Sequence, residues 1–144
     1  MALIYLTLEQ AIETHAKTVE VSGGGSLGQI DTGRLESVLQ NIQNDAYYPT
    51  FEAKLTHLFF CACKFHCFTD GNKRIAITLC AQMLLLNGYL GSIRFFIYEA
   101  ENISYHVASG LIEKELLGEW MQAVLNGQIE AEPLKLKILR AISQ

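Results

Sequence analysis

The sequence predicts an all-α fold, in a single domain that spans residues 1–144. Three observations support this prediction. Apolar residues recur at helical spacing along most of the chain, glycine, asparagine and proline separate these segments, and a length of 144 residues fits one domain. Half of the residues are hydrophobic and 18% are charged, which is typical of a chain with an ordered core. Ordinary helix lengths then give about six or seven helices.

The first two predicted helices are amphipathic. Thr7 and Gln10 have the spacing of a capping box, so the first helix should begin there and end before Ser22-Gly23-Gly24-Gly25. A loop should then continue to Asp31. Apolar residues at helical spacing from Leu35 to Ile42 predict the second helix. The tract from Asn44 to Thr50 contains Pro49 and two tyrosines, and it should form a short loop or hairpin.

Two central helices should follow, because both segments are apolar on most faces. The first runs from Phe51 to Phe65, and the second runs from Asn72 to Leu86 and ends at Asn87-Gly88. Aromatic and β-branched residues from Ile93 to Tyr98 indicate an extended segment.

Three helices are expected in the rest of the chain. The first covers Ala100–Ser109 and ends at Gly110, and the second covers Glu113–Leu125 and ends at Asn126-Gly127. Pro133 suits the first turn of the last helix.

Composition restricts the partners. A net charge of −4 gives no general attraction to nucleic acid, so we expect no nucleic-acid partner. No apolar stretch is long enough to cross a bilayer, and the first residues lack a signal-peptide pattern, so we expect a cytoplasmic protein without a membrane partner. The cysteines are expected to be reduced thiols, because their spacing matches neither a zinc site nor a disulfide framework; they are Cys61, Cys63, Cys67 and Cys80.

The candidate site is the run from His66 to Arg74. Lys73 and Arg74 should lie in the first turn of the second central helix, where the macrodipole disfavours cations by about 0.3–1 kcal/mol each. A bound anion would compensate for this, because free N–H groups at a helix start attract phosphate. The run therefore predicts a phosphate site, with the imidazole of His66 beside it as a base.

The same run resembles a known family signature. His66-x-Phe68-x-Asp70-Gly71-Asn72-Lys73-Arg74 is similar to the H-x-F-x-D-x-N-K-R motif of Doc ("death on curing") toxins in the Fic/Doc superfamily. Fic adenylyltransferases carry H-P-F-x-(D/E)-G-N-G-R instead. Cys67 replaces their proline and Lys73 replaces their second glycine, which favours the Doc branch. The resemblance covers about residues 5 to 125, on the ordinary boundary uncertainty of such comparisons, and leaves the tail from Gln128 to Gln144 unplaced.

The resemblance implies roles for the site residues. His66 would be the catalytic base, and Asp70 would bind Mg²⁺, although an aspartate at this place can also cap the helix. ATP phosphates would contact the four residues that follow, namely Gly71, Asn72, Lys73 and Arg74. We expect the ammonium of Lys73 to be buried or half-buried, in the space that glycine leaves open in Fic proteins.

The implied activity is transfer of the γ-phosphate of ATP to a protein hydroxyl. The resemblance points to a threonine of elongation factor Tu as the target, and so to inhibition of translation. Two alternatives stay open, namely AMP transfer of the Fic type and an inactive module that binds a nucleotide or peptide. In the family, a flap before the first central helix docks the target. Tyr47 and Tyr48 lie at that place in this chain.

Some Fic proteins inhibit themselves through an (S/T)-x-x-x-E-(G/N) helix. Thr32 to Glu36 and Ser109 to Glu113 match it only in part, so we expect a separate Phd-like antitoxin. The three histidines outside the motif are expected to have structural roles; they are His15, His57 and His106.

Overall fold

A computed structural model of the chain describes residues 2–21, 32–64, 72–127 and 132–143. Within these ranges the chain is all-helical and has no strand, as the sequence predicts. The seven described helices are α1 (Leu8–Val21), α2 (Thr32–Asn41), α3 (Phe51–Lys64), α4 (Asn72–Leu86), α5 (Leu90–Ala108), α6 (Lys114–Asn126) and α7 (Glu132–Ile142).

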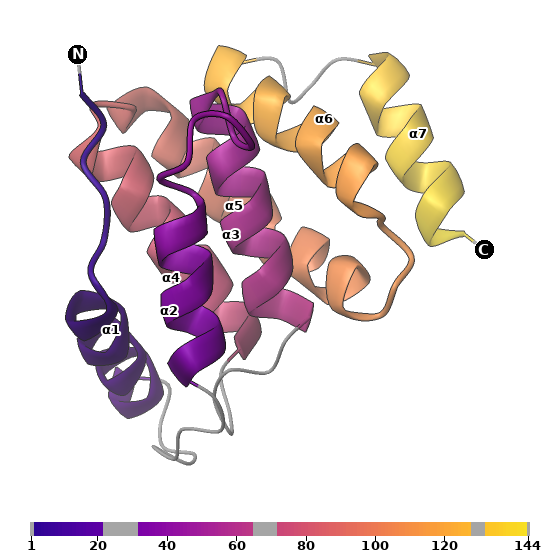
Figure 1. Cartoon of the computed structure of the whole chain (residues 1–144). Coiled ribbons are helices and arrows are strands. Elements are labelled where there is room, and N and C mark those ends of the chain that lie inside the picture. Colours follow the sequence, from indigo (N-terminus) through magenta and orange to yellow (C-terminus); the bar gives the residue numbers. More distant parts are fainter. Residues whose placement is uncertain (1, 22–31, 65–71, 128–131, 144) are drawn as a thin grey trace.

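Helix α3 lies at the centre of the domain (Figure 1). It packs against α2, α4, α5 and α6, while α1 covers α4 and α7 packs on α6. The middle of α3 is fully buried at Leu55, Leu58 and Phe59. The Phe59 ring meets Phe96 of α5 edge-on at 6.0 Å and Trp120 of α6 at 6.0 Å, so one aromatic cluster joins three helices. This packing fixes both ends of α3, and the candidate motif follows directly after its last residue.

The predicted helix boundaries are largely confirmed. The capping box closes reciprocally, because the Gln10 amide oxygen accepts from the Thr7 N–H at 2.9 Å and Thr7 Oγ1 accepts from the Gln10 N–H at 3.1 Å. Helix α4 ends at Asn87-Gly88, where Gly88 has a φ of 87° that favours glycine. The Asn87 side chain also binds the backbone N–H and carbonyl of Ile4, which ties the N-terminal segment to this helix end.

The prediction of an extended segment from Ile93 to Tyr98 is wrong. These residues lie inside α5, which also contains the helix predicted for Ala100–Ser109. Aromatic and β-branched residues favour strands on average, but tertiary packing overrides that preference. Phe96, Ala100, Ile103 and Val107 recur at helical spacing and are all buried, so only a helix places them together in the core.

The remaining elements agree with the sequence. Helix α6 ends before Gly127, whose φ is 69°, and Pro133 lies in the first turn of α7. Residues 44–50 form turns rather than a hairpin. Cys61, Cys63 and Cys80 are buried, and none of the three is in a disulfide within the described ranges. Across the described ranges, no helix is both long and apolar enough to cross a membrane.

Candidate active site at the start of α4

The sequence predicts a phosphate site in the motif that joins the last residue of α3 to the first turn of α4. Helix α4 begins at Asn72, so Lys73 and Arg74 lie in its first turn, as predicted. Among the described residues, neither cation forms an ion pair with a carboxylate. Two cations without a carboxylate partner in the described ranges therefore face the positive end of a helix dipole, which favours a bound anion.

The side chain of Lys73 differs from the sequence-based expectation. It is exposed rather than buried or half-buried. An exposed ammonium keeps its donors available for a ligand.

His66, Asp70 and Gly71 lie outside the described residues, and their predicted roles stay predictions. The described flanks of the motif nevertheless define its electrostatic surroundings. Burial raises the pKa of the Cys63 thiol to about 12, against the opposing effect of the charges on Lys73 and Lys64. Both ammonium groups therefore lie close to the end of α3, and the motif is flanked by positive charge.

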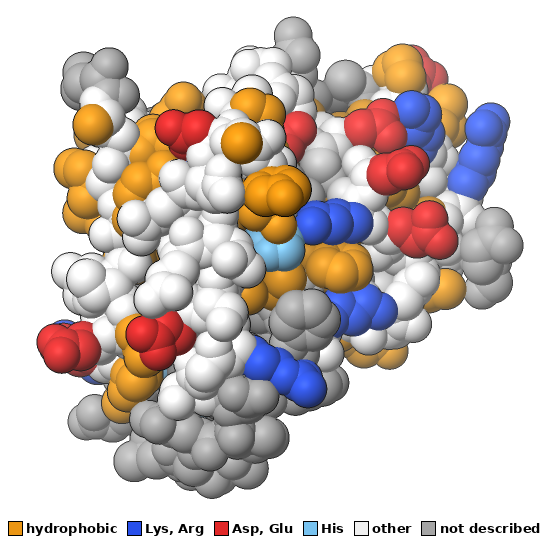
Figure 2. Space-filling model, in the orientation of Figure 1, with side chains coloured by type: hydrophobic (Ala, Val, Ile, Leu, Met, Phe, Trp, Pro, Cys, Tyr) orange, Lys and Arg blue, Asp and Glu red, His pale blue; other side chains and the backbone are white. Residues whose placement is uncertain are grey.

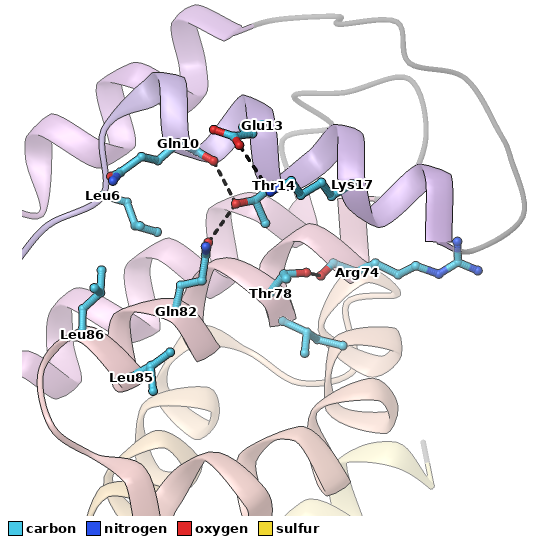
Figure 3. Close-up of a pocket in the computed structure, with 11 residues that line it drawn as sticks. Leu6, Gln10, Glu13, Thr14, Lys17, Arg74, Thr78, Gln82, Leu85 and Leu86 are labelled. Carbon is cyan, nitrogen blue, oxygen red and sulfur yellow. Dashed lines mark hydrogen bonds and ion pairs between the residues drawn. The ribbon is translucent and has the colours of Figure 1, made fainter.

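A cavity of about 790 Å³ lies between α1 and α4 (Figure 3). Arg74 extends its guanidinium at one end of this cavity, and Leu85 and Leu86 line the other end. In its middle, the buried Thr14 hydroxyl lies 2.8 Å from the Gln10 carbonyl oxygen and 3.0 Å from the Gln82 amide oxygen. Arg74 thus borders an apolar groove with a polar centre, whereas Lys73 does not line this groove.

The turn before α3 brings together residues that are distant in sequence. The Tyr48 ring stacks on the His57 ring at 4.5 Å between centroids, and the Tyr48 hydroxyl lies 3.2 Å from His57 Nε2. On the other side of the ring, Lys114 Nζ lies 2.8 Å from His57 Nδ1. Burial, together with the charge of Lys114, lowers the pKa of His57 to about 4.

This cluster corrects one expectation in part. From the sequence we expect His57 to have a structural role, as a core histidine whose ring is hydrogen-bonded to a backbone carbonyl. In the structure the ring is half-buried instead, and it contacts side chains from the turn and from α6. Sequence reasoning missed Lys114 as its partner, because 57 residues separate the two and no local pattern connects them. His15 is buried as expected, whereas His106 is half-buried.

The two tyrosines of the predicted flap differ in exposure. Tyr47 is 79% exposed and Tyr48 is half-buried against His57. Both line a second cavity of about 770 Å³ between the turn and helices α3, α6 and α7. Their part in target docking stays a prediction.

The donor chemistry of the motif fits Mg²⁺. Magnesium usually takes one or two carboxylates and completes its shell with phosphate oxygens and water. The described residues contain no cluster of three or more histidine, cysteine or acidic side chains that would form a cage made of protein alone. A single carboxylate, Asp70, combined with nucleotide phosphates, matches that preference.

The described residues form an all-helical domain, and the helix α4 begins inside the predicted phosphate motif. A sequence model of the Fic/DOC family matches residues 5–84, which include the whole motif, and the chain belongs to this family. Members are typically transferases that use ATP and Mg²⁺. The match ends at residue 84, so the resemblance from there to about residue 125 stays a prediction. No curated protein matches the chain in sequence.

Proposed function

We propose that the chain is a Doc-like protein kinase that transfers the γ-phosphate of ATP to a hydroxyl of a protein target. Lys73 is the observation that carries this proposal. It occupies the position where Fic adenylyltransferases have glycine, and it lies exposed and without a carboxylate partner, among the described residues, in the first turn of α4. A cation there attracts a terminal phosphate rather than leaving space for the chain of phosphates along the helix start.

In this mechanism the chain positions the reactants and stabilises charge, as expected for phosphoryl transfer. His66 accepts the proton of the attacking hydroxyl. Arg74 binds phosphate oxygens in a bidentate manner, and Lys73 acts as a point charge. Asp70 would hold Mg²⁺, which when bound neutralises charge on the phosphates.

The partners follow from the Doc resemblance. The target is elongation factor Tu, docked by the turn that carries Tyr47 and Tyr48, and modification would stop translation. That target places the chain in the cytoplasm. Neither partial match to the inhibitory helix is complete, so a separate Phd-like antitoxin restrains the enzyme.

Labelled ATP tests the reaction type. The purified chain is incubated with Mg²⁺, purified elongation factor Tu, and ATP labelled at either the α or the γ position. We expect label on the target from γ-labelled ATP only. Label from α-labelled ATP would show AMP transfer and overturn the kinase proposal. Label from neither, with elongation factor Tu or with a whole bacterial lysate, would favour an inactive binding module.

A further inference from the structure

Aromatic rings and lysines alternate from the turn before α3, across the start of α6, to the end of α3. We call Tyr48, Lys114, Phe60 and Lys64 the basic strip. Lys114 Nζ lies 5.8 Å from the ring centroid of Tyr48 and 5.8 Å from that of Phe60, and Lys64 Nζ lies 5.9 Å from the centroid of Phe60. Figure 2 shows Lys and Arg side chains gathered beside a histidine and hydrophobic side chains on one face. Two ammonium groups thus share one ring, and one of them ends the helix before the motif.

His57 fixes the orientation of Lys114. An ammonium group can only donate, so His57 Nδ1 must accept from it at 2.8 Å. The neutral ring then carries its proton on Nε2 and donates it to the Tyr48 hydroxyl oxygen at 3.2 Å. The pKa of His57, lowered to about 4, keeps the ring neutral at physiological pH. Lys114 is exposed and has further N–H donors, so a ligand can still reach it.

The lysines of the basic strip have no ion-pair partner in the described part of the chain. Neither Lys64 nor Lys114 forms an ion pair there, and the same holds for Lys73, which lies near Lys64 at the end of α3. The chain as a whole carries a net charge of −4. Lysines that lie close together without an ion-pair partner attract an anion locally, even on an acidic protein.

We propose that Lys64 and Lys114 form a subsite that binds the triphosphate of ATP, with His57 as a positioning residue for Lys114. The proposal rests on the proposed function for the identity of the nucleotide. Lys64 precedes His66 by two residues in the sequence and is the last described residue before the motif, so the strip reaches the start of the motif. An ammonium group binds phosphate as a point charge and tolerates a change in the phosphate's position as the reaction proceeds.

Binding measurements test the subsite without requiring transfer. Isothermal titration calorimetry of the full chain would use two probes, namely ATP with Mg²⁺ and sodium tripolyphosphate. We expect Lys64→Met and Lys114→Met each to raise the Kd of both probes about tenfold, since each removes a charge-assisted contact. The matched control is Lys137→Met, which removes the same charge from α7, where Lys137 pairs with Glu119 at 2.7 Å. It should change Kd less than about twofold.

A second set of variants tests the role of His57. His57→Leu should weaken binding in the natural chain but cause no further loss when Lys114 is already methionine, because it acts through that lysine. An equal loss in both backgrounds would overturn the positioning role. Lys114→Arg keeps the charge and should bind tripolyphosphate within about twofold of the natural chain. Thermal melting of every variant separates a loss of binding from a loss of folding.

The outcomes distinguish the subsite from the proposed function. Unchanged Kd values in both methionine variants would overturn the subsite, even if the natural chain transfers phosphate. If the methionine variants keep the Kd for ATP but raise the KM for the target protein, the subsite is also overturned. The basic strip would then bind the target protein. Binding that depends on the strip, without any transfer by the natural chain, would overturn the proposed function and leave the subsite in place.

Discussion

Lys73 is the residue on which the choice between phosphate and AMP transfer depends. Its ammonium stands where a glycine would leave space for phosphate oxygens at the start of α4. We expect Lys73→Gly to lower γ-phosphate transfer and to let AMP transfer appear. Intact mass spectrometry of the target distinguishes the two products. If the variant still adds only phosphate at the natural rate, the turn before α3 and the rest of the pocket set the orientation of ATP, and not this lysine.

His66 is the only imidazole in the motif, and no other residue of the motif can replace it as a base at neutral pH. His66→Ala should lower transfer by about 10²- to 10⁴-fold and leave the melting temperature close to that of the natural chain. Transfer rate and thermal melting would be measured on the same preparation. Full activity in a folded variant would exclude His66 from the mechanism.

Asp70 has two candidate roles that one substitution separates. As a helix cap alone, it would contribute about 1 kcal/mol of stability, and Asp70→Ala would melt earlier but remain active. As the Mg²⁺ ligand, its loss should abolish transfer, and so should removal of Mg²⁺ from the natural chain with EDTA. Melting curves and transfer assays with a range of Mg²⁺ concentrations test both roles. Partial rescue by excess Mg²⁺ would support the metal role.

At the scale of elements, Lys54 connects α2, the turn and α3. The residue is only 1% exposed, and its Nζ donates to the Ile42 carbonyl at 2.7 Å and to Asp45 Oδ1 at 2.7 Å. This lysine therefore holds the end of α2 and the turn that leads to Tyr47 and Tyr48. The sequence pattern of α3 does not reveal this role, because the partners lie in another element.

Removing Lys54 should weaken that connection. We expect Lys54→Met to lower the free energy of unfolding by about 1–3 kcal/mol, since a buried carbonyl loses its donor. Urea denaturation followed by circular dichroism measures the change. The control is Asp45→Asn, whose side chain is 81% exposed, and the expected cost is below about 1 kcal/mol. Equal costs for the two variants would show that the ion pair, and not the carbonyl contact, carries the stability.

At the scale of the whole molecule, His57 connects folding to pH. Its pKa is about 4 in the folded chain and about 6.5 in the unfolded chain. Between these values the unfolded chain binds more protons, so the contribution of His57 to stability falls as pH is lowered from 6.5 to 4. Above pH 6.5 the ring is neutral in both states and this contribution does not change.

The comparison with His57→Gln isolates this contribution from that of the carboxylates. We expect the melting temperature of the natural chain to fall more steeply than that of the variant between pH 6.5 and 4, and the two slopes to agree above pH 7. Scanning calorimetry across this range gives both slopes. Parallel curves throughout would mean that the pKa of His57 is the same in the folded and unfolded chains, contrary to the lowering expected from its burial and from the Lys114 ammonium.

The sequence by itself determined the features that depend on neighbouring residues. A capping box acts within one turn, and a glycine with positive φ ends a helix locally, so the starts of α1 and α4 and the ends of α4, α5 and α6 could be predicted. The motif is equally local: its helix start and the place of its two cations in the first turn were predicted correctly, whereas the burial of Lys73 was not. The resemblance to the Fic/Doc family could be seen from these motif residues, and the family match confirms it.

Only the tertiary structure decided the features that depend on distant partners. Residues 93–98 are helical because the buried face of α5 must meet Phe59 and Trp120, and this packing outweighs their preference for a strand. The contact between His57 and Lys114 exists because α6 packs against α3. The local spacing of residues cannot encode such pairs, since burial and charge act through space and not along the chain.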